Sequence, residues 1–404
     1  MATIMAKSSE HRGYRFARRM KNMNVSAVRE ILKVSERPEI ISFAGGMPAP
    51  ELFPVSAIAR AHAEMFELEG PASLQYSTTE GWRPLREWIS RRLTQKGIAT
   101  DADHVLMTSG SQQGIDLAAR VFLEPGDSVI VENPCYLAAL QTFSSYEVSY
   151  TAVDSDDEGI NIDQVEEALT KSNPKLIYIV TDFHNPKGTS LSIERRHRLV
   201  ELARQHQVPI LEDDPYGELR YRGIRPPSLA ALDSHGMVIY LSTFSKTISP
   251  GMRLGWATAS AEIIQSMVIA KQASDLHTST VEQRAAARLL ADFDYDGHVA
   301  TLCNEYGARC DAMLEAIDEY FPAGCRSTRP EGGLFVWVEL PASISGEELF
   351  EEAIAEGVAF VPGTSFFASE PKHNFIRLNF SNRPPEMIRE GVNRIGNILK
   401  KRLR

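Results

Sequence analysis

Residues 208–216 read VPILEDDPY, and residues 237–246 read MVIYLSTFSK. Each stretch is a short run of apolar residues that ends in acidic or hydroxyl side chains. Continuous apolar runs of this length are typical of strands that are buried on both faces of a parallel sheet. Because open α/β sheets bind ligands at the carboxyl ends of their strands, we expect the polar ends of both stretches to lie at a site.

Similar apolar runs recur through the middle of the chain and alternate with helical patterns. This alternation predicts an α/β fold with a mostly parallel, helix-covered sheet in a large domain. The expected strands are 105–108, 128–131, 176–180, 208–212, 237–242 and 254–258, and the expected helices between them include 112–122 and 192–206.

The pattern changes after about residue 290, where a smaller α+β domain is expected. Its expected elements are a long helix over 299–320, strand 334–339, helix 346–356, a short strand 358–361, strand 375–380 and helix 385–402. Residues 25–34 also have helical spacing of apolar residues. We expect residues 1–50 to pack with this C-terminal domain (291–404), and residues 51–290 to form the large domain.

Composition excludes several classes of protein. The 404 residues carry 43 Lys and Arg against 53 Asp and Glu, a net charge of −10, which argues against binding to nucleic acid or to an anionic membrane. Neither a membrane-spanning run nor a signal peptide is expected from the sequence. The spacing of the cysteines predicts free thiols in a reducing, cytoplasmic compartment. They are Cys135, Cys303, Cys310 and Cys325.

Common mononucleotide, dinucleotide, serine-hydrolase and zinc-protease motifs are absent from the sequence. The acidic stretch that starts at Asp154 resembles the beginning of a calcium loop, but its twelfth position is Val165, where a bidentate Glu is needed. We therefore expect no metal and interpret the stretch as a solvated strand-to-helix turn, with Asn161 or Asp163 as the helix cap.

Asp213 ends one of the apolar strands. A carboxylate at the end of a buried strand is costly unless it is paired, so Asp213 is either a ligand-binding acid or a cap before the following proline. Glu212 and Asp214 are the competing acids, and strand alternation places both on the face opposite to Asp213.

Four polar segments each follow an expected strand. They are Thr108-Ser109-Gly110-Ser111-Gln112-Gln113, Asn185-Pro186-Lys187-Gly188, Asp213-Asp214-Pro215-Tyr216, and Ser242-Thr243-Phe244-Ser245-Lys246 with Gly251-Met252-Arg253.

Their order and gaps resemble the fold-type-I enzymes that use pyridoxal 5'-phosphate (PLP), and specifically the class I aminotransferases. The resemblance is closest to the 2-aminoadipate/kynurenine aminotransferase group. It runs from about Phe43 to the C-terminus and includes FAGGMP (43–48), QYS (75–77), DLHT (275–278) and FVW (335–337).

The resemblance implies three catalytic residues. Lys246 would form the Schiff base with PLP and then move a proton between the substrate and the cofactor. Asp213 would pair with the protonated pyridine nitrogen, and Tyr216, with Asn185, would hydrogen-bond the phenolic oxygen.

The phosphate of PLP is expected at the start of helix 112–122, where unpaired backbone N–H groups and the helix dipole favour an anion. The resemblance adds side-chain donors to these amides and an aromatic ring that stacks on the pyridine. The implied cofactor-binding residues are Gly110, Ser111, Gln112, Tyr136, Thr243, Ser245 and Arg253.

The substrate is expected to be held by its α-carboxylate. Arg377 lies in a strand where alternation separates it from the apolar set, and it resembles the arginine that binds this carboxylate, with Asn185 and Gly45 beside it. In the resembling group a short N-terminal helix carries selectivity. Ser26 and Arg29 lie on that segment, and Arg29 matches a position that can hold a side-chain carboxylate.

Tyr76 bears on the assembly of the protein, and Lys187 is a departure of this chain from the family pattern. Tyr76 matches a tyrosine that crosses the dimer interface to the PLP phosphate of the other subunit, so the resemblance implies a homodimer with shared sites. Lys187 stands where the family usually has Thr, which puts a cation near the expected entrance to the cofactor site.

We therefore expect a PLP-dependent aminotransferase that uses an aromatic, branched-chain or 2-aminoadipate amino donor and, as the shared acceptor, 2-oxoglutarate. Another PLP reaction on the same scaffold, such as β-elimination, racemisation or decarboxylation, is the main alternative. A non-catalytic, aminotransferase-like regulator is the second. It would need a DNA-binding winged helix of about 70 residues ahead of the motif at Phe43, and 42 residues precede it.

Overall fold

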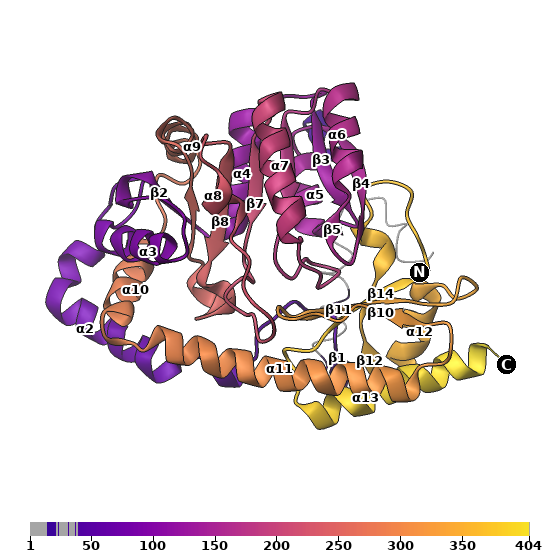
Figure 1. Cartoon of the computed structure of the whole chain (residues 1–404). Helices are drawn as coiled ribbons and strands as arrows, with labels where there is room; N and C mark the ends of the chain where they lie inside the picture. Colours follow the sequence, from indigo (N-terminus) through magenta and orange to yellow (C-terminus); the bar gives the residue numbers. More distant parts are fainter. Residues whose placement is uncertain (1–13, 22, 24–30, 32–36, 38, 404) are drawn as a thin grey trace.

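The computed structural model describes residues 14–21, 23, 31, 37 and 39–403. Its largest element is an eight-stranded sheet in the order β2-β9-β8-β7-β6-β3-β4-β5 (Figure 1). The strands are β2 (Val105–Thr108), β3 (Ser128–Asn133), β4 (Ser149–Asp156), β5 (Gly159–Ile160), β6 (Leu176–Ile179), β7 (Ile210–Asp213), β8 (Val238–Thr243) and β9 (Gly255–Thr258).

The centre of this sheet is parallel. Strands β4, β3, β6, β7 and β8 pair in parallel, whereas β9 runs antiparallel to both of its neighbours, β2 and β8. The amino end of β9 therefore lies at the same edge of the sheet as the carboxyl ends of β7 and β8. The predicted α/β class is confirmed, with a mixed rather than wholly parallel sheet.

Helices cover both faces of the sheet, because alternate residues of its strands are apolar in both directions (Figure 1). Leu211 and Ile239 pack on the face covered by α4, α5 and α9, and Ile210 and Val238 pack on the face covered by α6, α7 and α8. These helices are α4 (Ser111–Phe122), α5 (Leu137–Ser144), α9 (Ala261–Gln272), α6 (Ile162–Lys171), α7 (Ile193–His206) and α8 (Leu229–Leu232).

A second cluster of helices packs against β2 and β9, where Val105, Met107 and Trp256 form its core with Leu85 and Leu289. The helices are α2 (Val55–Ser73), α3 (Arg83–Gln95) and α10 (Thr280–Asp292). No helix of the described ranges is long and apolar enough to cross a membrane.

The smaller domain is built from both ends of the chain. Strand β1 (Ile41–Ser42) pairs in parallel with β12 (Val358–Ala359), and the backbone N–H of Asn379 donates to the carbonyl of Phe43. A four-stranded sheet in the order β10-β11-β14-β13 lies beside them. Its strands are β10 (Arg326–Ser327), β11 (Phe335–Glu339), β14 (Phe375–Asn379) and β13 (Val361–Pro362).

Helix α11 runs along the base of the molecule, from the large domain to the small one, beside α13 (Figure 1). The helices of this domain are α11 (Tyr295–Tyr320), α12 (Gly346–Ala355) and α13 (Pro385–Arg402). The domain boundaries near residues 50 and 290 stay a prediction.

The acidic stretch is the main local correction to the sequence prediction. Residues 149–156 form strand β4, which turns into the antiparallel β5 before α6 begins, so the segment is a β-hairpin rather than a strand-to-helix turn. The prediction of the cap holds, because the Asn161 side chain accepts a hydrogen bond from the N–H of Gln164. The helix expected over 25–34 lies outside the described residues, apart from Ile31.

Glu212 shows how the sheet and the helices on one face are joined. Its fully buried carboxylate accepts hydrogen bonds from the N–H groups of Leu229 and Ala230, at the start of α8, and from the hydroxyl of Thr181, each at 2.9 Å. Removing it would leave buried donors unpaired.

We predict that Glu212→Ala lowers the free energy of unfolding by about 3 kcal/mol, because three buried donors lose their acceptor. Thermal unfolding of the variant and of the unaltered protein checks this. Glu201→Ala is the control, since Glu201 lies on the exposed face of α7 and pairs with Arg204. Equal shifts in the two variants would contradict the role assigned to Glu212.

Candidate active site

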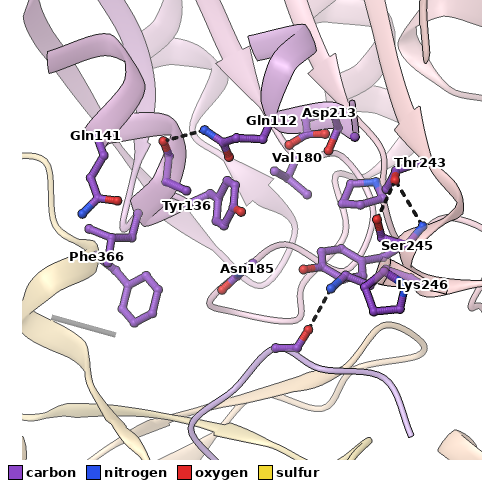
Figure 2. Close-up of a pocket in the computed structure, with 18 of the residues that line it drawn as sticks. Gln112, Tyr136, Gln141, Val180, Asn185, Asp213, Thr243, Ser245, Lys246 and Phe366 are labelled. Atoms are coloured by element: carbon purple, nitrogen blue, oxygen red, sulfur yellow. Dashed lines mark hydrogen bonds between the residues drawn. The ribbon is translucent and has the colours of Figure 1, made fainter. Parts of the chain in front are cut away.

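A cavity of ≈310 Å³ lies at the carboxyl edge of the large sheet, where the small domain meets it (Figure 2). It brings together most of the residues singled out from the sequence. Those that line it are Gly110, Ser111, Gln112, Tyr136, Asn185, Asp213, Tyr216, Thr243, Ser245, Lys246, Arg253 and Arg377.

Lys246 follows β8 in a short 3-10 turn (Phe244–Lys246). Its ammonium donates to the carbonyl of Gly46 at 2.8 Å, the contact drawn in Figure 2. Burial, together with the nearby cations Arg377 and Arg253, lowers the pKa of Lys246 to about 8. The amine is thus held in the cavity and is more easily deprotonated than an ordinary lysine.

Asp213 ends β7 with its side chain on the face that α4 and α5 cover. Its Oδ2 accepts from the Tyr178 hydroxyl at 3.0 Å, and its Oδ1 is buried with no hydrogen-bond partner. Burial raises the pKa of Asp213 to about 7. A buried carboxylate oxygen without a donor, facing a cavity, is suited to a ligand that brings an N–H group.

The two competing acids point elsewhere, as strand alternation predicts. Glu212 caps α8 on the opposite face of the sheet. Asp214 accepts from the N–H of Gly217 at 2.6 Å and from the Tyr240 hydroxyl at 2.7 Å. Neither acid lines the cavity.

The start of α4 forms one end of the cavity. Gly110 has a φ of +81°, and a Cβ there would lie 2.6 Å from Nη2 of Arg253. A Cβ on Gly255 would meet the backbone of Gly110 and Ser111 at 2.7 Å. Both positions need glycine so that β9 and Arg253 can approach the first turn of α4, whose leading N–H groups have no partner within the helix.

Arg253 lies at the α4 end of the cavity because strand β9, which follows it, runs antiparallel to β8. It lies just before that strand and donates from Nη2 to the Ser109 carbonyl at 2.8 Å. Thr243 and Ser245 lie nearby, and their hydroxyl oxygens are 2.9 Å apart. Figure 2 marks this hydrogen bond with a dashed line. Backbone N–H groups, two hydroxyls and a guanidinium together form an anion site.

Arg377 projects from β14 of the small domain into the cavity. Its Nη1 donates to Oδ1 of Asn185 at 2.7 Å, and its Nη2 donates to the carbonyl of Ala44 at 2.6 Å. The guanidinium carbon lies 4.4 Å from the ring centroid of Phe335 and 5.0 Å from that of Phe366. Arg377 is 3% exposed and lies on an internal strand, so it is not a surface arginine of an edge strand.

Other sequence predictions fall away from the cavity. Gly46 lines it rather than Gly45, and Tyr76 is 79% exposed outside it. Lys187 corrects an expectation, because its ammonium does not face the entrance to the cofactor site. It turns away and donates to the carbonyls of Ser155 and Asp156. Ser26 and Arg29 lie outside the described residues.

Several residues at the site were not foreseen. The hydroxyl of Tyr178 donates a hydrogen bond to Asp213. Tyr178 lies in the apolar strand β6, and strand alternation, which places it on the same face of the sheet as Asp213, could have indicated it from the sequence. Leu137, Gln141 and Phe366 complete the wall, and Figure 2 shows Gln141 and Phe366 at the opposite side from Lys246. Since Phe366 comes from a distant turn of the small domain, no local pattern indicated it.

The family model for "Aminotransferase class I and II" matches residues 39–395. The chain belongs to this family. It is 43% identical to Aromatic-amino-acid aminotransferase 1 of Thermococcus litoralis over 398 residues, which cover 96% of this chain and 95% of that protein. It is 40% identical to the 2-aminoadipate transaminase of Thermus thermophilus, over 94% of both chains.

The crystal structure of the Pyrococcus horikoshii kynurenine aminotransferase, in complex with PMP, superimposes with a TM-score of 0.92. It is 43% identical and covers 96% of this chain and 98% of its own. The resemblance stated from the sequence is confirmed, and the chain is a PLP-dependent aminotransferase.

The residues of the cavity fit PLP on independent grounds. The anion site at α4 suits a phosphate, the partnerless Oδ1 of Asp213 suits a protonated ring nitrogen, and the buried amine of Lys246 suits an aldehyde carbon. The cavity therefore offers a suitable partner to each of three chemically different groups of PLP.

We predict that acetylation of Lys246 in the cofactor-free enzyme rises with a midpoint near pH 8, because the lowered pKa makes the neutral amine available there. Mass spectrometry after acetic anhydride pulses at graded pH measures it. Arg377→Met should raise the midpoint, since it removes a neighbouring cation. A midpoint in the ordinary lysine range in the unaltered chain would contradict this environment.

Proposed function

We propose that the enzyme moves the amino group of an L-amino acid to a 2-oxo acid, in two half-reactions, with 2-oxoglutarate as the acceptor. The observation that carries the proposal is the pair formed by Arg377 and Asn185, which lies in the same cavity as Lys246 and Asp213. A forked guanidinium beside an amide is suited to a carboxylate, and the reacting amine is held nearby.

Bound PLP supplies an electrophilic carbonyl carbon and an electron-withdrawing ring. In this proposal Lys246 is the general base, which removes the proton from the substrate Cα and returns it at the cofactor. Asp213 keeps a proton on the ring nitrogen, and Tyr178 holds its other oxygen. Asn185 and Tyr216 donate to the phenolic oxygen.

The remaining cavity residues bind and orient. Tyr136 stacks on the ring, and the start of α4, with Thr243, Ser245 and Arg253, binds the phosphate. These groups hold the cofactor while Lys246 is free to move the proton. Arg377 holds the α-carboxylate, so the amino acid presents its Cα to the lysine.

The side-chain pocket favours aromatic or other large apolar donors. Phe335 and Phe366 flank Arg377, and Leu137 and Ala138 add apolar surface. Within the described lining, the cations are Lys246, Arg253 and Arg377, and each already has a role. A second carboxylate, as in 2-aminoadipate or 2-oxoglutarate, would need another cation, for which Arg29 is our candidate. Branched-chain donors also fit this apolar wall.

We predict that aromatic donors, added without acceptor, convert the absorbance of the PLP form to that of the PMP form, whereas Lys246→Ala abolishes the conversion. Arg377→Met should lower kcat/KM about a hundredfold, because a charge-assisted fork to the α-carboxylate is lost. Arg389→Met is the control, since Arg389 pairs with Glu319 on the surface.

The same assay separates the alternatives. Release of ammonia or pyruvate without any PMP form would favour a β-lyase and overturn the proposal. Wild-type rates in Lys246→Ala would show that Lys246 is not the general base.

We also propose a homodimer in which Tyr76 reaches the partner's cofactor. Tyr76, Leu74 and Leu276 are 79%, 71% and 54% exposed, and the Tyr76 ring packs edge-on against His277. Asp275 ties this loop to the first turn of α4, because it accepts from Gln113 Nε2 at 2.7 Å. An exposed apolar patch next to the phosphate end of the site supports an interface there. The four free cysteines fit a cytoplasmic location.

We predict that the active species sediments as a dimer and that Tyr76→Phe weakens PLP about tenfold, because one hydrogen bond to the phosphate is lost. Equilibrium dialysis of PLP measures the affinity. Tyr14→Phe is the control, since that exposed tyrosine packs against Phe16, far along the chain from this patch. A fully active monomer would contradict the shared site.

A further inference from the structure

Lys187 is a buried cation that the proposed chemistry does not use. It lies two residues after Asn185 and is 6% exposed. All three of its hydrogen bonds go to one hairpin: to the Ser155 carbonyl at 2.9 Å, the Ser155 hydroxyl at 3.2 Å and the Asp156 carbonyl at 2.7 Å. Three acceptors satisfy the full donor capacity of an ammonium.

The β4–β5 hairpin is itself bonded to helix α7. Asp156, at the end of β4, receives both terminal nitrogens of Arg195 from α7 at 2.7 Å, in a two-pronged ion pair. The same guanidinium donates to the carbonyl of Gly159 at 2.8 Å. The lysine is thus bonded to backbone that is itself fixed to a helix.

Burial lowers the pKa of Lys187, and acidic groups on β3 and on the hairpin act against this shift. Glu132, on β3, is 2% exposed, and its attraction to Lys187 opposes the burial that raises the pKa of this carboxyl. The charges of Asp156 and Asp157 raise the pKa of Lys187, as the charge of Glu132 does, whereas Arg195 lowers it. His184 lies 3.3 Å from Glu132, but burial and Lys187 lower its pKa to about 3, so it adds no cation.

The loop that Lys187 ties down carries Asn185. It closes on itself through the N–H of Gly188 and the carbonyl of His184, and through the N–H of His184 and the carbonyl of Thr189. Asn185 itself contacts two site residues. Its Oδ1 accepts from Arg377, and its side chain acts against the burial that raises the pKa of the Tyr216 hydroxyl. The amide therefore has one required orientation.

We propose that Lys187 is a positioning residue: by tying the loop of residues 184–189 to the β4–β5 hairpin, it fixes the Asn185 amide between Arg377 and Tyr216. The inference rests on the role proposed above for Asn185 toward the phenolic oxygen of PLP. The effect is mechanical, because Arg377 and Arg253, not Lys187, are the cations that lower the pKa of Lys246.

Lys187→Met tests the tether with two readouts that a loss of stability alone would not move. The first is the pH midpoint of the visible absorbance of bound PLP. It should rise by about half a pH unit or more, because a phenolic oxygen that loses a donor favours protonation of the cofactor. The second is the KM for the amino donor, which should rise about tenfold as Arg377 loses its fixed partner.

Three variants make the result decisive. Asn185→Ala is the reference, and it should move the midpoint in the same direction. Arg86→Met is the matched control, since Arg86 is also buried and donates to backbone carbonyls, of Gly81 and Ala102. It should lower thermal stability but leave midpoint and KM unchanged. Glu132→Gln/Lys187→Met should recover stability, because no unpaired carboxylate is buried, while the midpoint stays raised.

Each contrary outcome has a distinct meaning. A wild-type midpoint and KM in Lys187→Met, or in the double variant should the single one not fold, overturn the tether. Recovery of the midpoint in the double variant shows that charge acts instead, which also overturns it. An unmoved midpoint in Asn185→Ala, by contrast, removes the proposed role of Asn185 itself.

Discussion

The guanidinium of Arg377 is the point at which three separate parts of the chain meet. It projects from β14 of the small domain and donates to Asn185, on a loop of the large domain. It also donates to the carbonyl of Ala44, in the segment that follows β1. A cation that is 3% exposed needs these acceptors and the flanking aromatic rings, since an unpaired buried charge is costly. Arg377 therefore helps to fix the relative position of the two domains at the cavity, together with backbone hydrogen bonds from Cys135 to Phe366 and from Gly333 to Leu219.

Local charge, rather than total charge, defines the site. The chain has a net charge of −10, yet among the described residues that line its cavity Lys246, Arg253 and Arg377 face one acid, Asp213. Arg253 and Arg377 lie where a phosphate and a carboxylate are proposed to bind, and both lower the pKa of Lys246, the proposed base. Lys187 and Glu132 are also buried but do not line the cavity, and Lys187 is proposed to position the loop that carries Asn185.

Much of the architecture followed from apolar periodicity. Strands buried on both faces, such as β2 and β8, were located within about a residue, since continuous apolar runs leave little ambiguity. Strand β4 was missed because its residues are mostly exposed or part-exposed and its last three include two aspartates, and such a pattern does not separate a solvated strand from a turn. The direction of β9 was also not predicted, since an apolar run has no polarity.

The sequence alone determined the family, through the resemblance of its motifs, and the fold class, through the alternation of apolar strands and helices. It also predicted that the polar segments would share one site, because the ends of parallel strands converge at one edge of a sheet. Only the tertiary structure decided where individual side chains point. Lys187 is near Asn185 in sequence but bonds away from the cofactor, and Tyr178 and Phe366 join the site from other elements. The reason is physical: a buried polar group must find partners, and those partners come from segments that are distant in the chain.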